Sequence, residues 1–300
     1  MAHKIPNSID QTQSLLLSGG YIADRETATV LFLALSLKRP LFIEGEPGTG
    51  KTEIAKVLSA TLGRPLYRVQ CYEGLDLSSA AYEWNFSAQI TAIKLAEGTA
   101  RQQDLAANIY AENFLIKRPL LQALEPNAQG PAILLIDELD RADEPFEALL
   151  LEILSEFQIT IPELGLIKAA QPPIVIITSN RTREVHDAIK RRCLYHWVNY
   201  PSVARELAII EAKVPQASGD LSQQVAKFAN SIRTMGLFKP PGIAESIDWA
   251  NALLTLNALA LSPEVIQSTL GVLLKYKEDI ARLTPSEITN HLARVQHAEP

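Results

Sequence analysis

The sequence predicts an α/β protein, with a parallel sheet flanked by helices up to about residue 200 and a helical region after it. In the first part, short apolar runs typical of strands buried on both faces alternate with helical stretches, which favours a parallel sheet. After Pro201 no apolar run suited to a strand occurs, and we expect helices at 203–213, 221–235, 243–261 and 263–283. A length of 300 residues is typical of two domains, so we place an α/β core at 1–200 and a helical lid at 201–300.

Residues 45–52 match the phosphate-binding loop pattern G-x-x-x-x-G-K-[ST] at every position. They are Gly45, Glu46, Pro47, Gly48, Thr49, Gly50, Lys51 and Thr52. A strand candidate at 41–43 precedes the loop, and residues 52–62 have apolar side chains at helical spacing. Backbone N–H groups of such a loop surround nucleotide phosphates, Lys51 would reach the β- and γ-phosphates, and Thr52 would bind Mg²⁺. The alternative is a chance glycine-rich turn, and the flanking elements favour the nucleotide site.

Two carboxylates follow an apolar run at 133–136, which is typical of a strand buried on both faces. Ligands of open α/β sheets bind beyond the carboxyl ends of the strands, which is where Asp137 and Glu138 are expected. Asp137 would then hold Mg²⁺ and Glu138 would act as the general base that polarises the attacking water. The alternative is that both residues cap a helix expected at 144–157.

A third strand candidate covers 174–179 and is followed by Asn180. If this strand neighbours the previous one, the Asn180 amide would lie near the γ-phosphate and could orient the water. The alternative is that Asn180 is an ordinary turn residue.

Together these segments resemble an AAA+ ATPase, whose fold is a P-loop NTPase core with a helical lid. Residues 45–52 resemble its Walker A motif, 133–138 its Walker B motif, and Asn180 its sensor-1 residue. Residues 187–193 are similar to the helix end that carries the arginine finger in this family. The resemblance implies that Arg192, or Arg191 as second choice, adds positive charge at the ATP of a neighbouring subunit. Taken alone, the arginine pair could equally compensate a helix dipole.

Three segments that are less specific than the Walker motifs resemble the MoxR branch of AAA+ proteins and, within it, the CoxD-like group. These segments are CYEGLD at 71–76 with YEWNF at 82–86, RPLLQALEP at 118–126, and FQITIPELGLI at 157–167. The resemblance implies a helix-2 insertion at about 82–98 and a pre-sensor-1 hairpin at about 157–169, and the period-two pattern of the latter supports a hairpin independently. One departure is Glu245, which stands where the sensor-2 arginine of many AAA+ lids would be expected, so Arg233 or another base would have to substitute.

The resemblance also implies an assembly and a role. An arginine finger acting in trans requires a homo-oligomeric ring, which is commonly a hexamer in this family. The implied activity is ATP hydrolysis that drives a chaperone or remodelling machine, with the two insertions facing the client. The implied partners are a von Willebrand factor A-domain protein and a client metalloenzyme, a molybdenum hydroxylase such as carbon monoxide dehydrogenase.

Composition narrows the possible partners. A net charge of −6 disfavours nucleic acid, because nucleic-acid binding depends on Lys and Arg that neutralise phosphates. No segment approaches the roughly 18 consecutive apolar residues of a membrane span, and the N-terminus lacks the apolar stretch of a secretory signal. Cys71 and Cys193 are far apart, which favours reduced thiols and a cytoplasmic location, and the five histidines form no ligand cluster for a transition metal.

Two other functions stay open from the residues alone. A DNA-dependent AAA+ motor or loader would show DNA-stimulated hydrolysis, and the acidic composition counts against it. A nucleotide-gated binding scaffold with little turnover is supported by Glu245 at the sensor-2 position. The presence of Glu138 and of the arginine pair argues against such a scaffold.

Overall fold

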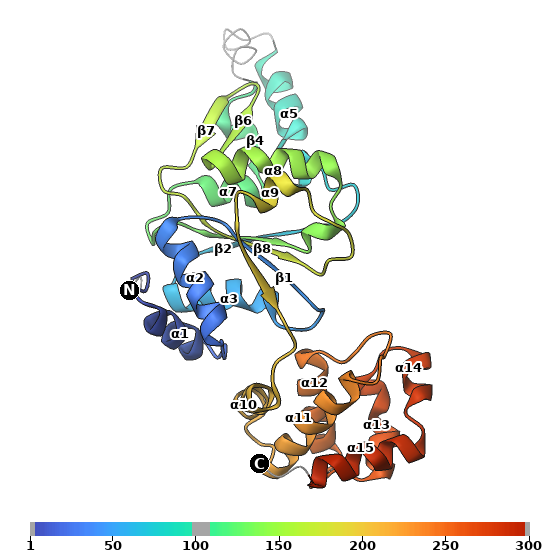
Figure 1. The fold of residues 1–300 in the computed structure, drawn as a ribbon. Coiled ribbons are helices and arrows are strands. Elements are labelled where there is room, and N and C mark those ends of the chain that lie inside the picture. The colour runs from blue at the N-terminus through green and yellow to red at the C-terminus, as the bar shows by residue number, and fades with distance from the viewer. Residues whose placement is uncertain (1–3, 98–108, 298–300) are drawn as a thin grey trace. The chain divides into compact units, whose positions relative to one another are not determined.

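A computed structural model describes residues 4–97 and 109–297 (Figure 1). The chain divides into two compact units. The first contains Met1–Leu15, Arg25–Glu44 and Thr52–Trp197, and the second contains Leu16–Asp24, Gly45–Lys51 and Val198–Pro300. The phosphate-loop segment therefore belongs to the second unit, although the strand before it and most of the helix after it belong to the first.

A five-stranded sheet with the order β2-β5-β8-β1-β9 forms the centre of the first unit. Its strands are β1 (Leu41–Gly45), β2 (Leu66–Gln70), β5 (Ile133–Asp137), β8 (Ile174–Ser179) and β9 (Leu194–Val198). The pairs β1–β8, β5–β8 and β2–β5 are parallel. Every residue of β1 and β5 is buried, which explains their uninterrupted apolar runs. The predicted fold class, a parallel sheet with a helical C-terminal region, is confirmed.

Helices cover both faces of this sheet. Figure 1 shows α2 (Arg25–Leu37) and α3 (Lys51–Leu62) on one face, and α7 (Pro119–Leu124), α8 (Glu144–Glu156) and α9 (Asp187–Lys190) on the other. The remaining helical elements up to β9 are α1 (Ile9–Ser18), α4 (Leu77–Ala80), α5 (Phe86–Ala96), η1 (Glu112–Phe114) and η2 (Leu139–Arg141).

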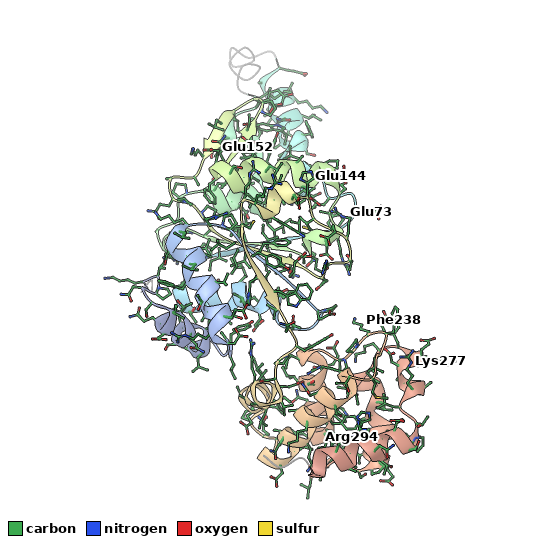
Figure 2. All side chains as sticks on the ribbon, in the orientation of Figure 1. Glu73, Glu144, Glu152, Phe238, Lys277 and Arg294 are labelled. Atoms are coloured by element: carbon green, nitrogen blue, oxygen red, sulfur yellow. The ribbon has the colours of Figure 1, made fainter. Side chains whose placement is uncertain are left out.

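Two small antiparallel pairs lie outside the main sheet. The strands β3 (Tyr82–Trp84) and β4 (Leu115–Lys117) precede and follow α5. β3 and α5 lie in the segment expected as the helix-2 insertion, and β4 lies beyond its expected end. Residue 98 of that expected insertion lies outside the described residues. The hairpin β6 (Gln158–Ile161) and β7 (Gly165–Lys168) occupies the segment expected as the pre-sensor-1 hairpin. Glu152 of α8, labelled in Figure 2, accepts a hydrogen bond of 2.7 Å from the Thr160 hydroxyl and so anchors β6.

After β9 the described chain is helical. The helices are α10 (Val203–Lys213), α11 (Gly219–Arg233), α12 (Ile243–Thr255), α13 (Pro263–Leu273), α14 (Lys277–Arg282) and α15 (Pro285–His297). They enclose a separate apolar core around Phe228 and Trp249, both fully buried. The Trp249 indole N–H donates to the Thr269 hydroxyl at 2.8 Å, so this large side chain is buried without an unpaired donor.

Three expectations for these helices need correction. The helix expected at 243–261 ends at Thr255, because Asn257 adopts a left-handed φ of 55°, a conformation that commonly ends helices. The helix expected at 263–283 is two helices, α13 and α14, with extended backbone at Leu274 and Tyr276 between them. The break allows buried Asp279 to accept backbone hydrogen bonds from residues 238 and 239, so tertiary contacts override the helical pattern. The final helix, α15, was not expected.

Candidate nucleotide site

The loop between β1 and α3 has a backbone that only glycine allows at several positions. Gly48 and Gly50 have φ values of 74° and 85°, in the left-handed region. A Cβ atom added to Gly45 would lie 2.2 Å from the carbonyl oxygen of Val198, which leaves no room for a side chain. The glycines of the phosphate-loop pattern therefore follow from backbone geometry and from the close approach of β9.

This loop presents unpaired donors beside a buried cation. Within residues 4–97 and 109–297, the backbone N–H groups of Gly48, Thr49 and Gly50 have no hydrogen-bond acceptor. The Lys51 ammonium is buried and donates to the carbonyl oxygens of Gly45 at 2.8 Å and Glu46 at 2.7 Å. Adjacent free N–H groups at the start of a helix fit an anion, as the sequence predicts for nucleotide phosphates.

Asp137, at the end of β5, is the most densely hydrogen-bonded carboxylate of the site. Its Oδ1 accepts from the hydroxyl groups of Thr52 at 2.9 Å and Thr178 at 2.5 Å. Its Oδ2 accepts from Nε and Nη2 of Arg68 at 3.0 and 2.6 Å. The structure therefore brings together Thr52 and Asp137, the two residues expected to hold Mg²⁺, and adds a cation that the sequence analysis did not include.

Glu138 follows Asp137 in a left-handed conformation, with φ 56° and ψ 51°, which is rare and costly outside glycine. Its Oε1 accepts from the Asn180 side-chain amide at 3.3 Å, and its Oε2 accepts from the Gln70 amide at 2.9 Å. Arg141 forms an ion pair with the same Oε2 at 3.2 Å. The side chains expected to activate and to orient water therefore lie in direct contact.

Neither carboxylate caps the following long helix. The N-cap of α8 is Asp143, whose side chain accepts from the backbone N–H of Phe146 at 3.1 Å. Glu138 precedes the short 3₁₀ helix η2, and its side chain makes no capping hydrogen bond there. The capping alternative for Asp137 and Glu138 is therefore not what the structure shows.

A buried carboxylate, Asp140, holds the segment after β8. It accepts hydrogen bonds from the backbone N–H groups of Asn180 at 3.1 Å and Thr182 at 2.9 Å, and from the Thr182 hydroxyl at 2.6 Å. Burial acts to raise the pKa of Asp140, but the hydrogen bonds from Thr182 and Asn180 outweigh it and the pKa is lowered. Asp140 thus fixes the backbone that carries the Asn180 amide.

The two finger candidates lie away from these carboxylates. Arg192 donates from Nε to the Ser155 hydroxyl of α8 and from Nη1 to the carbonyl oxygen of Ala188 at 2.8 Å. The Arg191 side chain is exposed and has no partner within the described part of the chain. Its backbone carbonyl accepts from Arg39 at 3.0 Å. Among the residues described, neither arginine contacts Asp137 or Glu138 of its own chain.

In the region expected to carry sensor 2, the charged side chains of Glu245 and Arg233 form hydrogen bonds within the helical part of the chain. Glu245 accepts from the backbone N–H of Gly242 at 3.0 Å and so caps α12. Arg233 donates to both carboxylate oxygens of fully buried Glu206, at 2.5 and 2.7 Å, and to the Pro241 carbonyl at 2.8 Å. Because its guanidinium is engaged in this way, Arg233 is not a free replacement for a sensor-2 arginine.

Four contributors to the site were not expected from the sequence: Arg68, Gln70, Asp140 and Arg141. The first two lie on β2, an edge strand in which only Val69 is buried and which was not among the strands expected. Their spacing of two residues, which places side chains on one face of a strand, is the signal that could have revealed them. Asp140 is three residues past a strand, where only the tertiary structure shows what it binds.

The donor set fits a nucleotide with Mg²⁺. Oxygen atoms of Thr52 and Asp137 are the type of ligand that Mg²⁺ prefers, with phosphate oxygens and water completing the shell. Among the residues that the structure describes, no group of three or more His, Cys, Asp or Glu side chains is arranged to hold a metal ion. In the same residues, no helix is both long and apolar enough to cross a membrane.

The lowered pKa of Asp140 predicts a pH-dependent contribution to stability. Because its folded pKa lies below the unfolded value near 4, the contribution is present above about pH 4 and is lost as the pH falls through the folded pKa. We expect Asp140→Asn to lower the free energy of unfolding at pH 7 by about 2 kcal/mol and by less at pH 3. Urea unfolding at both pH values measures this, with exposed Asp248→Asn as control. An equal loss at both pH values would contradict the assignment.

Comparisons with known proteins identify the family of this chain. The family model of the AAA domain (dynein-related subfamily) matches residues 40–193, just over half of the chain. An uncharacterized protein of Staphylococcus saprophyticus is 25% identical over 232 residues, covering 75% of this chain and 80% of that protein. One of Staphylococcus epidermidis is 27% identical over 241 residues, covering 78% and 82%.

Solved structures of RuvB from Thermotoga maritima are also similar. A proline-to-glycine variant has a TM-score of 0.49 and 15% identity, covering 95% of this chain and 76% of that one. The RuvB Holliday junction branch migration motor has a TM-score of 0.46 and 15% identity, covering 89% and 72%. The family match spans β1, the phosphate loop, both carboxylates and Asn180. The chain therefore belongs to the family described as AAA domain (dynein-related subfamily).

Proposed function

We propose that this protein is an ATP hydrolase that binds ATP with Mg²⁺ and uses turnover to remodel a client protein. One observation carries the proposal: Thr52, Asp137, Glu138 and Asn180, from three separate segments, converge at the carboxyl ends of neighbouring parallel strands. This is the edge of an α/β sheet at which ligands bind.

In this proposal, Lys51 and the unpaired N–H groups of the loop bind the phosphates. Lys51, which now donates to two loop carbonyls, would donate to phosphate oxygens, and the free N–H groups of Gly48 to Gly50 would cradle them. Thr52 and Asp137 would hold Mg²⁺, which neutralises phosphate charge when bound. If the metal takes Oδ2 of Asp137, Arg68 would have to leave, because its Nε and Nη2 both donate to that oxygen.

Glu138 is the residue that we propose as general base. Its carboxylate would accept a proton from the attacking water, and the contact with Asn180 would orient that water. In the structure, Gln70 and Arg141 also engage Glu138. These contacts hold the carboxylate in place.

For the arginine finger, the contacts separate the two candidates. Arg192 is tethered to Ser155 and Ala188 within its own subunit, whereas the exposed Arg191 side chain is unengaged in the described structure. This favours Arg191 more than the sequence alone does, and Arg192 would act only after losing these hydrogen bonds. Either residue implies a homo-oligomeric ring, for which a hexamer is the state that the AAA+ resemblance suggests.

The exposed apolar side chains of the first unit support a client-binding role. On α5, Phe86 and Ile90 are one helical turn apart and are 60% and 53% exposed, and Leu95 is 78% exposed. On β7, Leu166 is 57% exposed. Figure 1 shows α5, β6 and β7 at the same end of this unit. Contiguous exposed apolar residues of this kind are typical of protein interaction sites.

The finer assignment rests on sequence resemblance. We propose a MoxR-type machine of the CoxD-like group, acting as a chaperone with a von Willebrand factor A-domain partner. The client would be a metalloenzyme under maturation, such as a molybdenum hydroxylase. A cytoplasmic location is part of this proposal, and it agrees with Cys71 and Cys193, which are both buried free thiols.

Replacing the proposed base tests hydrolysis directly. We expect Glu138→Gln to bind ATP as wild type does but to lose at least about 100-fold in turnover, because the amide cannot accept the proton. Steady-state phosphate release measures turnover, and native mass measured with and without ATP reports assembly. Glu144→Gln, an exposed carboxylate at the start of α8, is the matched control and should leave turnover unchanged.

The same assay separates the other functions. Wild type that binds ATP but never hydrolyses it, even when assembled, would replace the motor by a nucleotide-gated scaffold. Turnover that rises strongly with DNA would favour a DNA-dependent motor. Equal turnover in wild type and Glu138→Gln would remove Glu138 from the reaction.

Mixing subunits tests the finger. Arg191→Ala subunits retain their own phosphate loop, so adding Lys51→Ala subunits should restore turnover to part of the wild-type level, because each variant supplies what the other lacks. Arg192→Ala should show this complementation only if Arg192 is the finger. Absence of complementation by both variants, in rings that still assemble, would contradict a finger acting in trans.

A further inference from the structure

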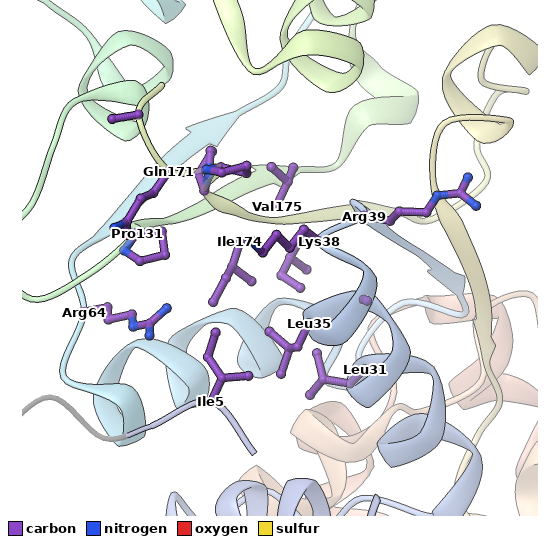
Figure 3. A pocket seen from close by; sticks show the side chains of 15 residues that line it. Ile5, Leu31, Leu35, Lys38, Arg39, Arg64, Pro131, Gln171, Ile174 and Val175 are labelled. Atoms are coloured by element: carbon purple, nitrogen blue, oxygen red, sulfur yellow. The ribbon is translucent and has the colours of Figure 1, made fainter. Parts of the chain in front are cut away.

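A cavity of about 420 Å³ lies in the first unit, at the amino ends of the strands (Figure 3). Ile174 at the start of β8 lines it, together with Pro131 ahead of β5, Leu35 of α2 and Arg64 after α3. The carboxylates of the nucleotide site follow the opposite ends of the same strands. The length of β8 separates the two places by roughly 17 Å. The cavity is therefore distinct from the nucleotide site, and we call it the Arg64 pocket.

The wall of the Arg64 pocket is apolar, with cations and no carboxylate. Leu31, Leu35, Ile174 and the neighbouring prolines provide the apolar surface, and Lys38, Arg39 and Arg64 provide positive charge. No aspartate or glutamate lines it, although acidic residues outnumber basic ones in the chain by 34 to 28. Nη2 of Arg39 donates to the carbonyl oxygens of Arg191 and Cys193. Arg39 therefore adds positive charge beside the cavity, but its Nη2 is already hydrogen-bonded.

Arg64 is the cation in this wall that has buried nitrogen atoms without partners. Its Nε and Nη1 are buried and have no hydrogen-bond acceptor within residues 4–97 and 109–297. No ion pair is formed by Arg64 among those residues. Burial lowers the pKa of its guanidinium, because desolvation disfavours the charged form. Leaving buried guanidinium donors unpaired costs free energy that a neutral side chain of the same length would avoid.

The guanidinium is also held in one position. It packs on the backbone of Gly130, whose φ is 100°, and a Cβ atom there would approach Cζ, Nε and Nη2 of Arg64 to 3.4 Å. The carbonyl oxygen of Arg64 accepts from the Ser59 hydroxyl of α3 at 2.7 Å, which fixes its backbone. A fixed, partly desolvated guanidinium binds an oxyanion with less loss of side-chain freedom than an exposed one.

We propose that the Arg64 pocket binds a small organic carboxylate with an apolar body. The carboxylate oxygens accept from Nη2 of Arg64, the guanidinium nitrogen that is neither hydrogen-bonded nor fully buried among the described residues, and Lys38 adds a second positive charge at the rim. The apolar walls take the hydrocarbon part, and they disfavour a compact, strongly hydrated dianion such as inorganic phosphate. The cavity volume is within the range of small-molecule sites. The carboxylate could belong to a free metabolite or to the C-terminal residue of a peptide, because both present this chemistry.

Calorimetric titration of the full chain with hexanoate, without nucleotide or Mg²⁺, tests the proposal independently of ATP hydrolysis. We expect saturable binding of one hexanoate per chain, with much weaker binding of hexanol, which lacks the charge, and of acetate, which lacks the apolar body. Phosphate is expected not to compete. A leucine dipeptide with a free or an amidated C-terminus, added as a competitor of hexanoate, shows where the carboxylate comes from. Displacement of hexanoate by the free form alone indicates the C-terminus of a peptide, and displacement by neither form indicates a free metabolite.

Variants assign the binding to Arg64. Arg64→Met keeps the length of the side chain and removes the donors, so we expect hexanoate affinity to fall at least about tenfold. The melting temperature of this variant should equal or exceed that of wild type, because an unpaired buried charge is removed. Arg64→Lys should bind with intermediate affinity. Arg294→Met, an exposed arginine on α15 labelled in Figure 2, is the control and should bind hexanoate as wild type does.

Three results would overturn the proposal. They are absence of hexanoate binding to folded wild type, equal affinity of wild type and Arg64→Met, and hexanol binding as tightly as hexanoate. A lower melting temperature in Arg64→Met with unchanged hexanoate affinity would show that the guanidinium serves only the fold.

Discussion

The carboxylate of Asp137 is the interaction on which the site depends. It is buried at the end of a central strand and accepts hydrogen bonds from three other segments: Thr52 at the start of α3, Thr178 of β8, and Arg68 of β2. A charged group in such a position is stable only when its oxygens are paired. The demand to satisfy Asp137 therefore links the phosphate-loop helix to both neighbouring strands, and it places Glu138, the next residue, against Asn180.

The partners of Asp137 also balance its charge. Arg68 supplies a positive charge beside the carboxylate, and Gln70, two residues later on β2, holds Glu138. A divalent ion that takes Oδ2 of Asp137 has to displace Arg68, whose side chain is about half exposed and can move into solvent. Binding of such an ion and release of the Arg68 contact are therefore expected to be coupled, because Nε and Nη2 of Arg68 already take both lone pairs of Oδ2.

Much of this arrangement could be predicted from the sequence because it depends on local patterns. Uninterrupted apolar runs predict the strands ending at Asp137 and Ser179, and the glycine spacing predicts the loop before α3. Contacts between distant segments could not be predicted in this way. Arg68 is on an edge strand in which only Val69 is buried, and the break between α13 and α14 follows from Asp279 binding the backbone at 238–239. The pairing of Arg233 with Glu206, which removes a sensor-2 candidate, is likewise tertiary.

The most direct test of the central claim is the Mn²⁺ affinity of the ATP-bound protein, followed by electron paramagnetic resonance with Mn²⁺ in place of Mg²⁺. If Asp137 is the metal ligand and Arg68 its competitor, Asp137→Asn weakens Mn²⁺ binding at least about tenfold, and Arg68→Met strengthens it severalfold. Arg118→Met, an arginine of similar exposure paired with Glu83, leaves the affinity unchanged. Equal Mn²⁺ affinity in wild type, Asp137→Asn and Arg68→Met would contradict a metal site organised around Asp137.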